Sequence, residues 1–83
     1  MKKKATTTNN PWPNIQELIE NGGNISIGEI RPIRCAAVAA DESNMLAALQ
    51  RRDNEKLVDL LDRLDQAIKK AVEEEIFTDE INS

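Results

Sequence analysis

Hydrophobic residues recur at three- and four-residue spacing along residues 54–75, where the chain carries its strongest pattern. Such spacing places apolar side chains in one stripe along a helix. The large members of this stripe are Leu57, Leu60, Leu61, Leu64, Ile68 and Val72. Mostly charged and amide residues lie on the opposite side. The pattern predicts an amphipathic helix over residues 54–75 that packs its stripe against another element.

A shorter apolar pattern lies closer to the start of the chain. Ile15, Leu18 and Ile19 have helical spacing, and Asn21-Gly22-Gly23 follows them. Glycine readily adopts the left-handed conformation that ends many helices. We therefore predict a helix of about two turns over residues 13–20.

Residues 24–51 allow more than one interpretation. Ile25, Ile27 and Ile30 favour a strand, whereas Gly28 and Pro32 break it, which indicates an edge strand or an extended connector. The stretch from 32 to 51 is rich in alanine, a strong helix former and a poor strand former, and we favour a helix there. The competing interpretation places a break at the capping residue types of positions 41–44, between a strand and a short helix.

Two helices of similar length, over residues 32–51 and 54–75, with a tight turn between them, indicate a helical hairpin. The predicted fold class is therefore all-α: a small helical hairpin or bundle forming a single domain over residues 13–83. The alternative is an α+β fold with a short strand or hairpin in residues 24–39. We expect residues 1–12 to be a disordered basic tail that ends in a Trp/Pro anchor.

The small size of the chain, 83 residues, makes its core marginal. Cys35 is the single cysteine, so no internal disulfide forms, and without histidine it does not build a structural zinc site. Association between chains is then the expected source of extra stability. In the predicted hairpin Val38, Met45 and Leu49 remain outside, and we expect them to form the contact face of a homodimer. The alternative is a monomer, in which the first helix and residues 25–30 cover this face.

The net charge of −4 is unevenly distributed, with +2 over residues 1–34 and −6 over residues 35–83. Because the acidic part contains the predicted long helix, that helix is a poor match for a phosphate backbone. The run Lys2-Lys3-Lys4 is typical of a solvated tail. An alternative function is nevertheless nucleic-acid contact through this tail together with Arg51 and Arg52.

Few residues suggest catalysis, because the chain lacks histidine, tyrosine and a phosphate-binding loop. Asp59, Asp62 and Asp65 share one helix face, but Arg63 and two lysines are interspersed among them. Aspartates in such a pattern form a solvated face with pairs at i,i+4 spacing, here Asp59 with Arg63 and Asp65 with Lys69. We predict no catalytic residue, no cofactor site and no metal site.

Two further residues have alternative interpretations. Cys35 lies among alanines and is expected to be a buried small hydrophobic residue rather than a reactive thiolate. Trp12, between two prolines, either holds the tail against the first helix or contacts a partner. Arg51 and Arg52 are candidate partner contacts as well, although their place near a helix end also suits the helix dipole.

The function that these patterns favour is a non-enzymatic, small helical protein-interaction module that self-associates and binds a protein partner of unknown identity. The alternative is a small regulator that contacts nucleic acid through its basic tail. No apolar run reaches the roughly 20 residues needed to span a bilayer, and we expect no membrane contact. A cytoplasmic location is expected because the start of the chain has no apolar core typical of a secretory signal.

Overall fold

The computed structural model describes residues 10–82 of the chain. The expected disorder of the tail, together with Lys2, Lys3 and Lys4, therefore falls mostly outside the described residues. The elements follow one another in a simple order along the chain. They are α1 (Pro13–Glu20), β1 (Asn24–Ile30), β2 (Ile33–Ala40), β3 (Met45–Gln50), α2 (Leu57–Glu74) and β4 (Thr78–Asp79).

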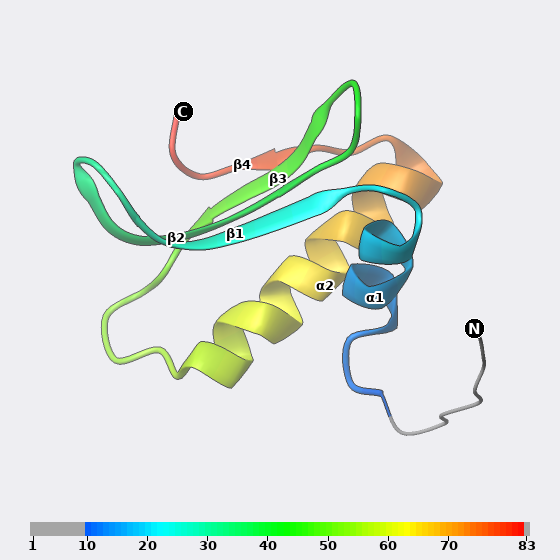
Figure 1. The fold of residues 1–83 in the computed structure, drawn as a ribbon. Helices are drawn as coiled ribbons and strands as arrows, with labels where there is room; N and C mark the ends of the chain where they lie inside the picture. The colour runs from blue at the N-terminus through cyan, green and yellow to red at the C-terminus, as the bar shows by residue number, and fades with distance from the viewer. Residues whose placement is uncertain (1–9, 83) are drawn as a thin grey trace.

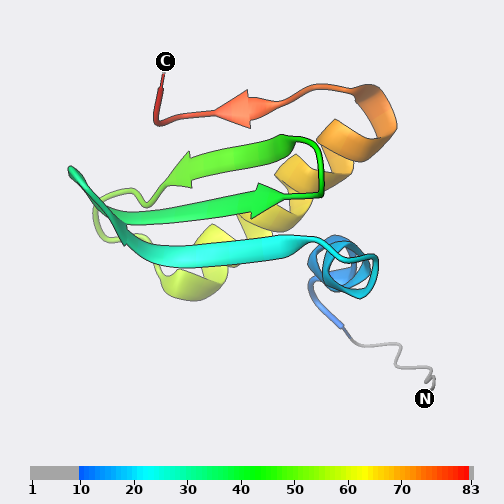
Figure 2. The ribbon, with the colours of Figure 1, turned by 45° about the horizontal axis from the view of Figure 1, so that its top comes forward.

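The strands form one sheet in the order β1-β2-β3-β4. The first three strands are antiparallel neighbours, whereas β4 runs parallel to β3, with Ala47 opposite Thr78. Both helices lie on the same face of this sheet, and no helix of the described residues covers the other face (Figures 1 and 2). We call these the helix face and the outer face.

The predicted all-α class is wrong, and the helical-hairpin description with it, because the chain folds as α+β. Residues 32–51, for which we favoured one helix, form β2, a turn and β3. The helix over 13–20 is present with the same bounds, and the long helix begins at Leu57 rather than at residue 54. The α+β alternative has the observed class, but its hairpin in residues 24–39 covers only part of the sheet.

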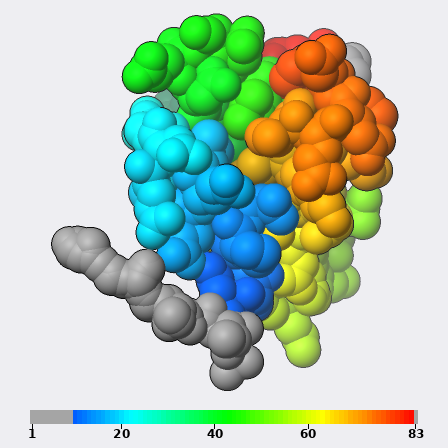
Figure 3. All heavy atoms as spheres, turned by 90° about the vertical axis from the view of Figure 1, so that its right-hand side faces the viewer, coloured from blue at the N-terminus to red at the C-terminus, as the bar shows by residue number. Residues whose placement is uncertain are grey.

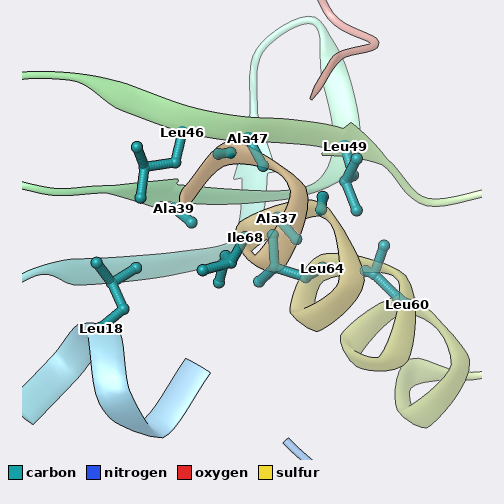
Figure 4. Close-up of a cluster of buried hydrophobic side chains, with 11 residues drawn as sticks. Leu18, Ala37, Ala39, Leu46, Ala47, Leu49, Leu60, Leu64 and Ile68 are labelled. Carbon is teal, nitrogen blue, oxygen red and sulfur yellow. The ribbon is translucent and has the colours of Figure 1, made fainter. Parts of the chain in front are cut away.

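Packing against α2 explains why alanine-rich segments form strands here. Ala37, Ala39 and Ala47 point from the helix face into the core and are fully buried (Figure 4). A methyl group lets the α2 backbone lie close to the sheet, so tertiary contact decides the conformation. Strand preference depends on such packing more than on intrinsic backbone preference.

The core lies between the helix face and the two helices. Leu18 enters it from α1, and Leu60, Leu64 and Ile68 enter it from α2 (Figure 4). Leu61 is half-buried. By contrast, Leu57 and Val72, which we expected in the apolar stripe, are 48% and 67% exposed because they lie at the two ends of α2. The stripe is thus buried only along its middle turns.

Two irregular segments shape the β1 side of the sheet. The turn after α1 packs closely, since a Cβ on Gly23 would lie 2.5 Å from the Leu18 Cδ1 atom and 2.9 Å from the Ala40 carbonyl oxygen. Within β1, Gly28 has a φ of +140°, and the pairing register with β2 shifts between Gly28 and Ile30. The shift is a bulge that bends the strand near its end.

Candidate functional site

A groove opens between α1, the turn that joins β2 to β3, and the C-terminal half of α2. Its volume is about 490 Å³. Figure 3 faces this side of the molecule, where α1 in blue, the β2–β3 turn in green and the end of α2 in orange come together. The apolar lining residues are Leu18, Leu46, Ile68 and Val72. We call this feature the α1–α2 groove.

The rim of the α1–α2 groove is acidic. Its charged lining residues are Glu17, Asp41, Glu42 and Glu73, and no lysine or arginine is among the lining residues. The uncharged polar lining residues are Asn14, Asn21 and Ser43. Within residues 10–82 the ion pairs join Arg31 to Glu29 and Arg63 to Glu55 and Glu80, so the rim carboxylates have no ionic partner there.

The α1 wall of the groove is held by Asp65 of α2. The Oδ1 atom of Asp65 accepts hydrogen bonds from the backbone N–H groups of Asn14 and Ile15, at 2.8 and 2.9 Å. Its Oδ2 atom accepts a third, at 2.8 Å, from the Asn14 side-chain amide. These donors lie in the first turn of α1, where N–H groups have no partner within the helix. Asp65 thus caps α1 from another element.

This position corrects the expectation that Asp65 lies on a solvated face and pairs with Lys69. Asp65 is 2% exposed and bonds to α1 instead. The residue before α1, Trp12, provides no side-chain cap, so the first turn needs an acceptor from elsewhere. A helix without its own capping side chain is the signal in the sequence that points to such an acceptor.

Trp12 ties the segment before α1 to α2. Its indole Nε1–H donates to the Oδ1 atom of Asp62 at 2.8 Å, and its backbone N–H donates to the Asn10 side chain at 2.9 Å. The ring is half-buried. Of the two sequence interpretations, attachment within the chain is the one that has a contact here, with α2 as the attachment point rather than α1.

The β2–β3 turn is ordered by Asp41. Its carboxylate accepts hydrogen bonds from the backbone N–H groups of Ser43 and Asn44 at 2.8 and 2.7 Å. The bonds from Asn44 and then Ser43 lower the pKa of Asp41 below its ordinary value. The rim of the groove therefore keeps this negative charge well below neutral pH.

Arg63 organises the opposite end of α2. Its guanidinium donates to both carboxylate oxygens of Glu55, at 2.8 and 3.0 Å, to Glu80 at 2.9 Å and to the Gln50 carbonyl oxygen at 3.0 Å. The expected pair of Asp59 with Arg63 is thus replaced by a bidentate contact from Arg63 to the loop before α2. This arrangement joins α2, the β3–α2 loop and the segment after β4.

Arg51 and Arg52 lie beside this cluster, in the loop after β3. The Arg51 Nε atom donates to the backbone carbonyl of Glu55 at 2.8 Å, and the backbone N–H of Arg52 donates to the Glu55 carboxylate at 2.9 Å. Asp53 and Glu80 line a shallow depression together with both arginines. The candidate contact residues of this loop are therefore surrounded by carboxylates.

The Glu55 contact gives a pH-dependent prediction. Arg63 lowers the pKa of Glu55 from 4.5 to about 2, against the opposing effect of burial. A lowered folded-state pKa stabilises the fold above pH 4.5, and this contribution is lost as the pH falls toward about 2. We expect Glu55→Gln to lower the free energy of unfolding by about 2 kcal/mol at neutral pH. Urea unfolding of both proteins should show this gap close on acidification.

Glu42→Gln serves as the matched control for that measurement. Glu42 is exposed and lies in no ion pair within the described residues. Its substitution should leave the urea midpoint nearly unchanged at every pH. A gap between Glu55→Gln and the wild type that stays constant down to about pH 2 would contradict the role given to Arg63.

The predicted self-association residues do not share one face. Pairing across the strands places Val38 and Met45 on the outer face, since the register shift between Ala39 and Ala40 interrupts the alternation of β3, whereas Leu49 points to the helix face. Leu49 is only 1% exposed and is part of the core. The face predicted from helical spacing is therefore divided between the two faces of the sheet, because side chains alternate along a strand and the register shift separates Met45 from Leu49.

Other sequence candidates lie away from the groove. Cys35 is half-buried, with a free thiol packed against the edge of the core. Within residues 10–82 no three Cys, Asp or Glu side chains gather to hold a metal ion. Neither α1 nor α2 is both long and apolar enough to cross a membrane. No family model, no curated protein and no solved structure matches this chain.

Sequence reasoning did not predict the α1–α2 groove. Its residues come from three elements that are far apart along the chain, and its acidic residues follow no motif. The one usable signal was the run of capping residue types at positions 41–44, which only the competing interpretation treated as a break, while we favoured a continuous helix. The groove depends on that break being the turn of a β-hairpin.

Proposed function

We propose that this chain is a small, non-enzymatic α+β protein-interaction module that holds a segment of another protein in the α1–α2 groove. The observation that carries the proposal is Val72, which lines the edge of the groove and is 67% exposed, next to the buried apolar residues of the floor. A large aliphatic side chain in that position gains free energy when a partner covers it.

The size and lining of the groove support binding of a peptide segment. Its volume of about 490 Å³ lies within the roughly 300–1,000 Å³ usual for ligand pockets. Apolar groups form the floor, while Asn21 and Ser43 provide donors and acceptors that suit a peptide backbone. The cytoplasm stays the proposed location.

Affinity capture with two matched variants tests the proposal. Val72 and Val58 are both exposed valines of α2, but only Val72 lines the groove. We expect Val72→Asn to retain about tenfold less of the partner than the wild type, since it removes apolar contact without adding charge. Val58→Asn should retain the wild-type amount. Quantitative mass spectrometry of proteins captured from the native cells measures both.

Two results would contradict the proposed function. In the first, the wild-type chain retains nothing beyond what an unrelated bait retains. In the second, Val72→Asn and Val58→Asn retain the same proteins in the same amounts. Circular dichroism and urea midpoints of the variants show beforehand that each is folded.

Self-association stays a prediction. Val38 and Met45 lie on the outer face, beside Ala36, Ala40 and Ala48, where a second copy has access to them. Leu49 is excluded as a contact residue by its burial. Nucleic-acid binding through Arg51 and Arg52 also stays a prediction, and the carboxylates around these arginines make it the weaker alternative.

A further inference from the structure

We infer that the partner segment of the α1–α2 groove is basic, with lysine or arginine side chains on either side of an aliphatic residue. This inference rests on the proposed function and adds the chemistry of the partner. It follows from two features of the groove taken together, which are the sign of its charges and the apolar surface between them.

The first feature is the unbalanced charge at the rim. Glu17 of α1, Asp41 and Glu42 of the turn, and Glu73 of α2 approach the groove from three elements, and none has an ionic partner within residues 10–82. Like charges around one opening repel one another. A cation that enters the opening relieves this repulsion, whereas an anion adds to it.

Asp41 strengthens this argument because the β2–β3 turn holds its carboxylate in a fixed position. The backbone N–H groups of Ser43 and Asn44 hold its carboxylate in place. The orientation of Asp41 is therefore set before a ligand arrives. A preorganised charge of this kind favours recognition because no side-chain freedom is lost on binding.

The second feature is the apolar floor. The buried side chains of Leu18, Leu46 and Ile68 form its base, and exposed Val72 extends it to the surface. Lysine and arginine have long aliphatic stems that cover apolar surface while the charged head stays at the periphery. An aliphatic residue between two such side chains fills the floor. A hydrated metal cation or a small polar cation does not match this lining.

The test uses synthetic peptides and the 83-residue chain. The probe is fluorescein-labelled Gly-Lys-Leu-Lys-Leu-Lys-Gly, compared with one peptide that has glutamate for lysine and another that has serine for leucine. Fluorescence anisotropy measures each binding curve. We expect the lysine–leucine peptide to bind, the serine peptide to bind about tenfold more weakly, and the glutamate peptide not to bind. Added salt should weaken binding.

Charge-reversal variants locate the binding site. Glu17→Lys combined with Glu73→Lys should weaken binding of the lysine–leucine peptide about tenfold, since two attractive contacts become repulsive. Glu20→Lys combined with Glu74→Lys makes the same charge change on the same helices outside the groove lining. This control should change affinity less than about twofold. Equal weakening by both pairs would overturn the inference.

The other occupants of the groove are separate outcomes of the test. Sedimentation equilibrium that shows a dimer, with Val72→Asn reducing it to a monomer, would place a second copy in the groove. A variant with Lys2, Lys3 and Lys4 changed to glutamine that binds the peptide at least about tenfold more tightly would place the chain's own lysines there. Either result would overturn assignment of the groove to a partner's basic segment.

Failure of the inference is distinguishable from failure of the proposed function. Suppose that Val72→Asn retains less of the captured partner than Val58→Asn, while the glutamate–leucine peptide binds as well as the lysine–leucine peptide. In that case only the inference of a basic partner segment is wrong. If the difference between the two variants is also absent, the proposed function falls with it.

Discussion

Asp65→Ala is expected to lower the free energy of unfolding by about 3 kcal/mol. The carboxylate of Asp65 is buried and accepts three hydrogen bonds from the first turn of α1. Alanine leaves those donors without a partner and removes a negative charge from the positive end of the helix dipole. Because α1 forms a wall of the α1–α2 groove, peptide binding should weaken as well.

Urea unfolding and amide hydrogen exchange check this expectation. The backbone amides of Asn14 and Ile15 should exchange faster in Asp65→Ala than in the wild type. Asp59→Ala is the control, because Asp59 is an exposed aspartate in the first turn of the same helix. If both variants lose the same stability, the capping role of Asp65 is wrong.

Leu64→Ala is expected to cost about 3–4 kcal/mol, close to the usual loss at a buried leucine. Leu64 has no solvent exposure and lies in the centre of the core between α2 and the sheet (Figure 4). Removal of its branched end leaves a cavity that rigid strands cannot close. For a domain of this size such a loss is a large part of the total stability.

Leu57→Ala is the variant that distinguishes the observed fold from the predicted helical hairpin. The predicted hairpin placed Leu57 and Leu64 in one stripe, whereas the structure leaves Leu57 48% exposed. The observed fold therefore predicts a loss below about 1 kcal/mol for Leu57→Ala. Chemical denaturation of both variants measures the difference, and comparable losses would favour the hairpin over the sheet.

The two helices were predictable because local signals and tertiary packing agree there. Pro13 suits the first position of a helix, and the glycines after residue 21 end it, so α1 has the predicted bounds. In α2 the spacing of Leu60, Leu64 and Ile68 follows the helical repeat, and the same residues fill the core. Where the local signals and the tertiary packing favour the same structure, that structure can be predicted from the sequence.

The sheet was not predicted because local preference and tertiary packing favour different structures in these segments. Alanine at positions 36, 37, 39, 47 and 48 favours a helix by intrinsic preference, yet all of these residues lie in strands and are buried. The decisive contact, α2 lying over the methyl groups of Ala37, Ala39 and Ala47, joins segments far apart in the chain. Sequence spacing within one segment contains no information about that contact.

The candidate site was hidden for a related reason. Asp65 follows the polar pattern of its helix, and only the position of α1 turns it into a buried cap. Glu17, Asp41 and Glu73 are ordinary acidic residues until the fold brings their elements around one groove. A site whose residues come from several elements can be recognised only once the arrangement of those elements is known.

The bulge in β1 also affects the behaviour of the chain at high concentration. An edge strand has unpaired backbone N–H and C=O groups, to which a strand of a neighbouring molecule can hydrogen-bond. Repetition of this pairing builds a fibril. Here Gly28, with its φ of +140°, and the register shift next to it break the straight template partway along. On the opposite border β4 is only two residues long. Both borders of the sheet are thereby poor seeds for fibril growth.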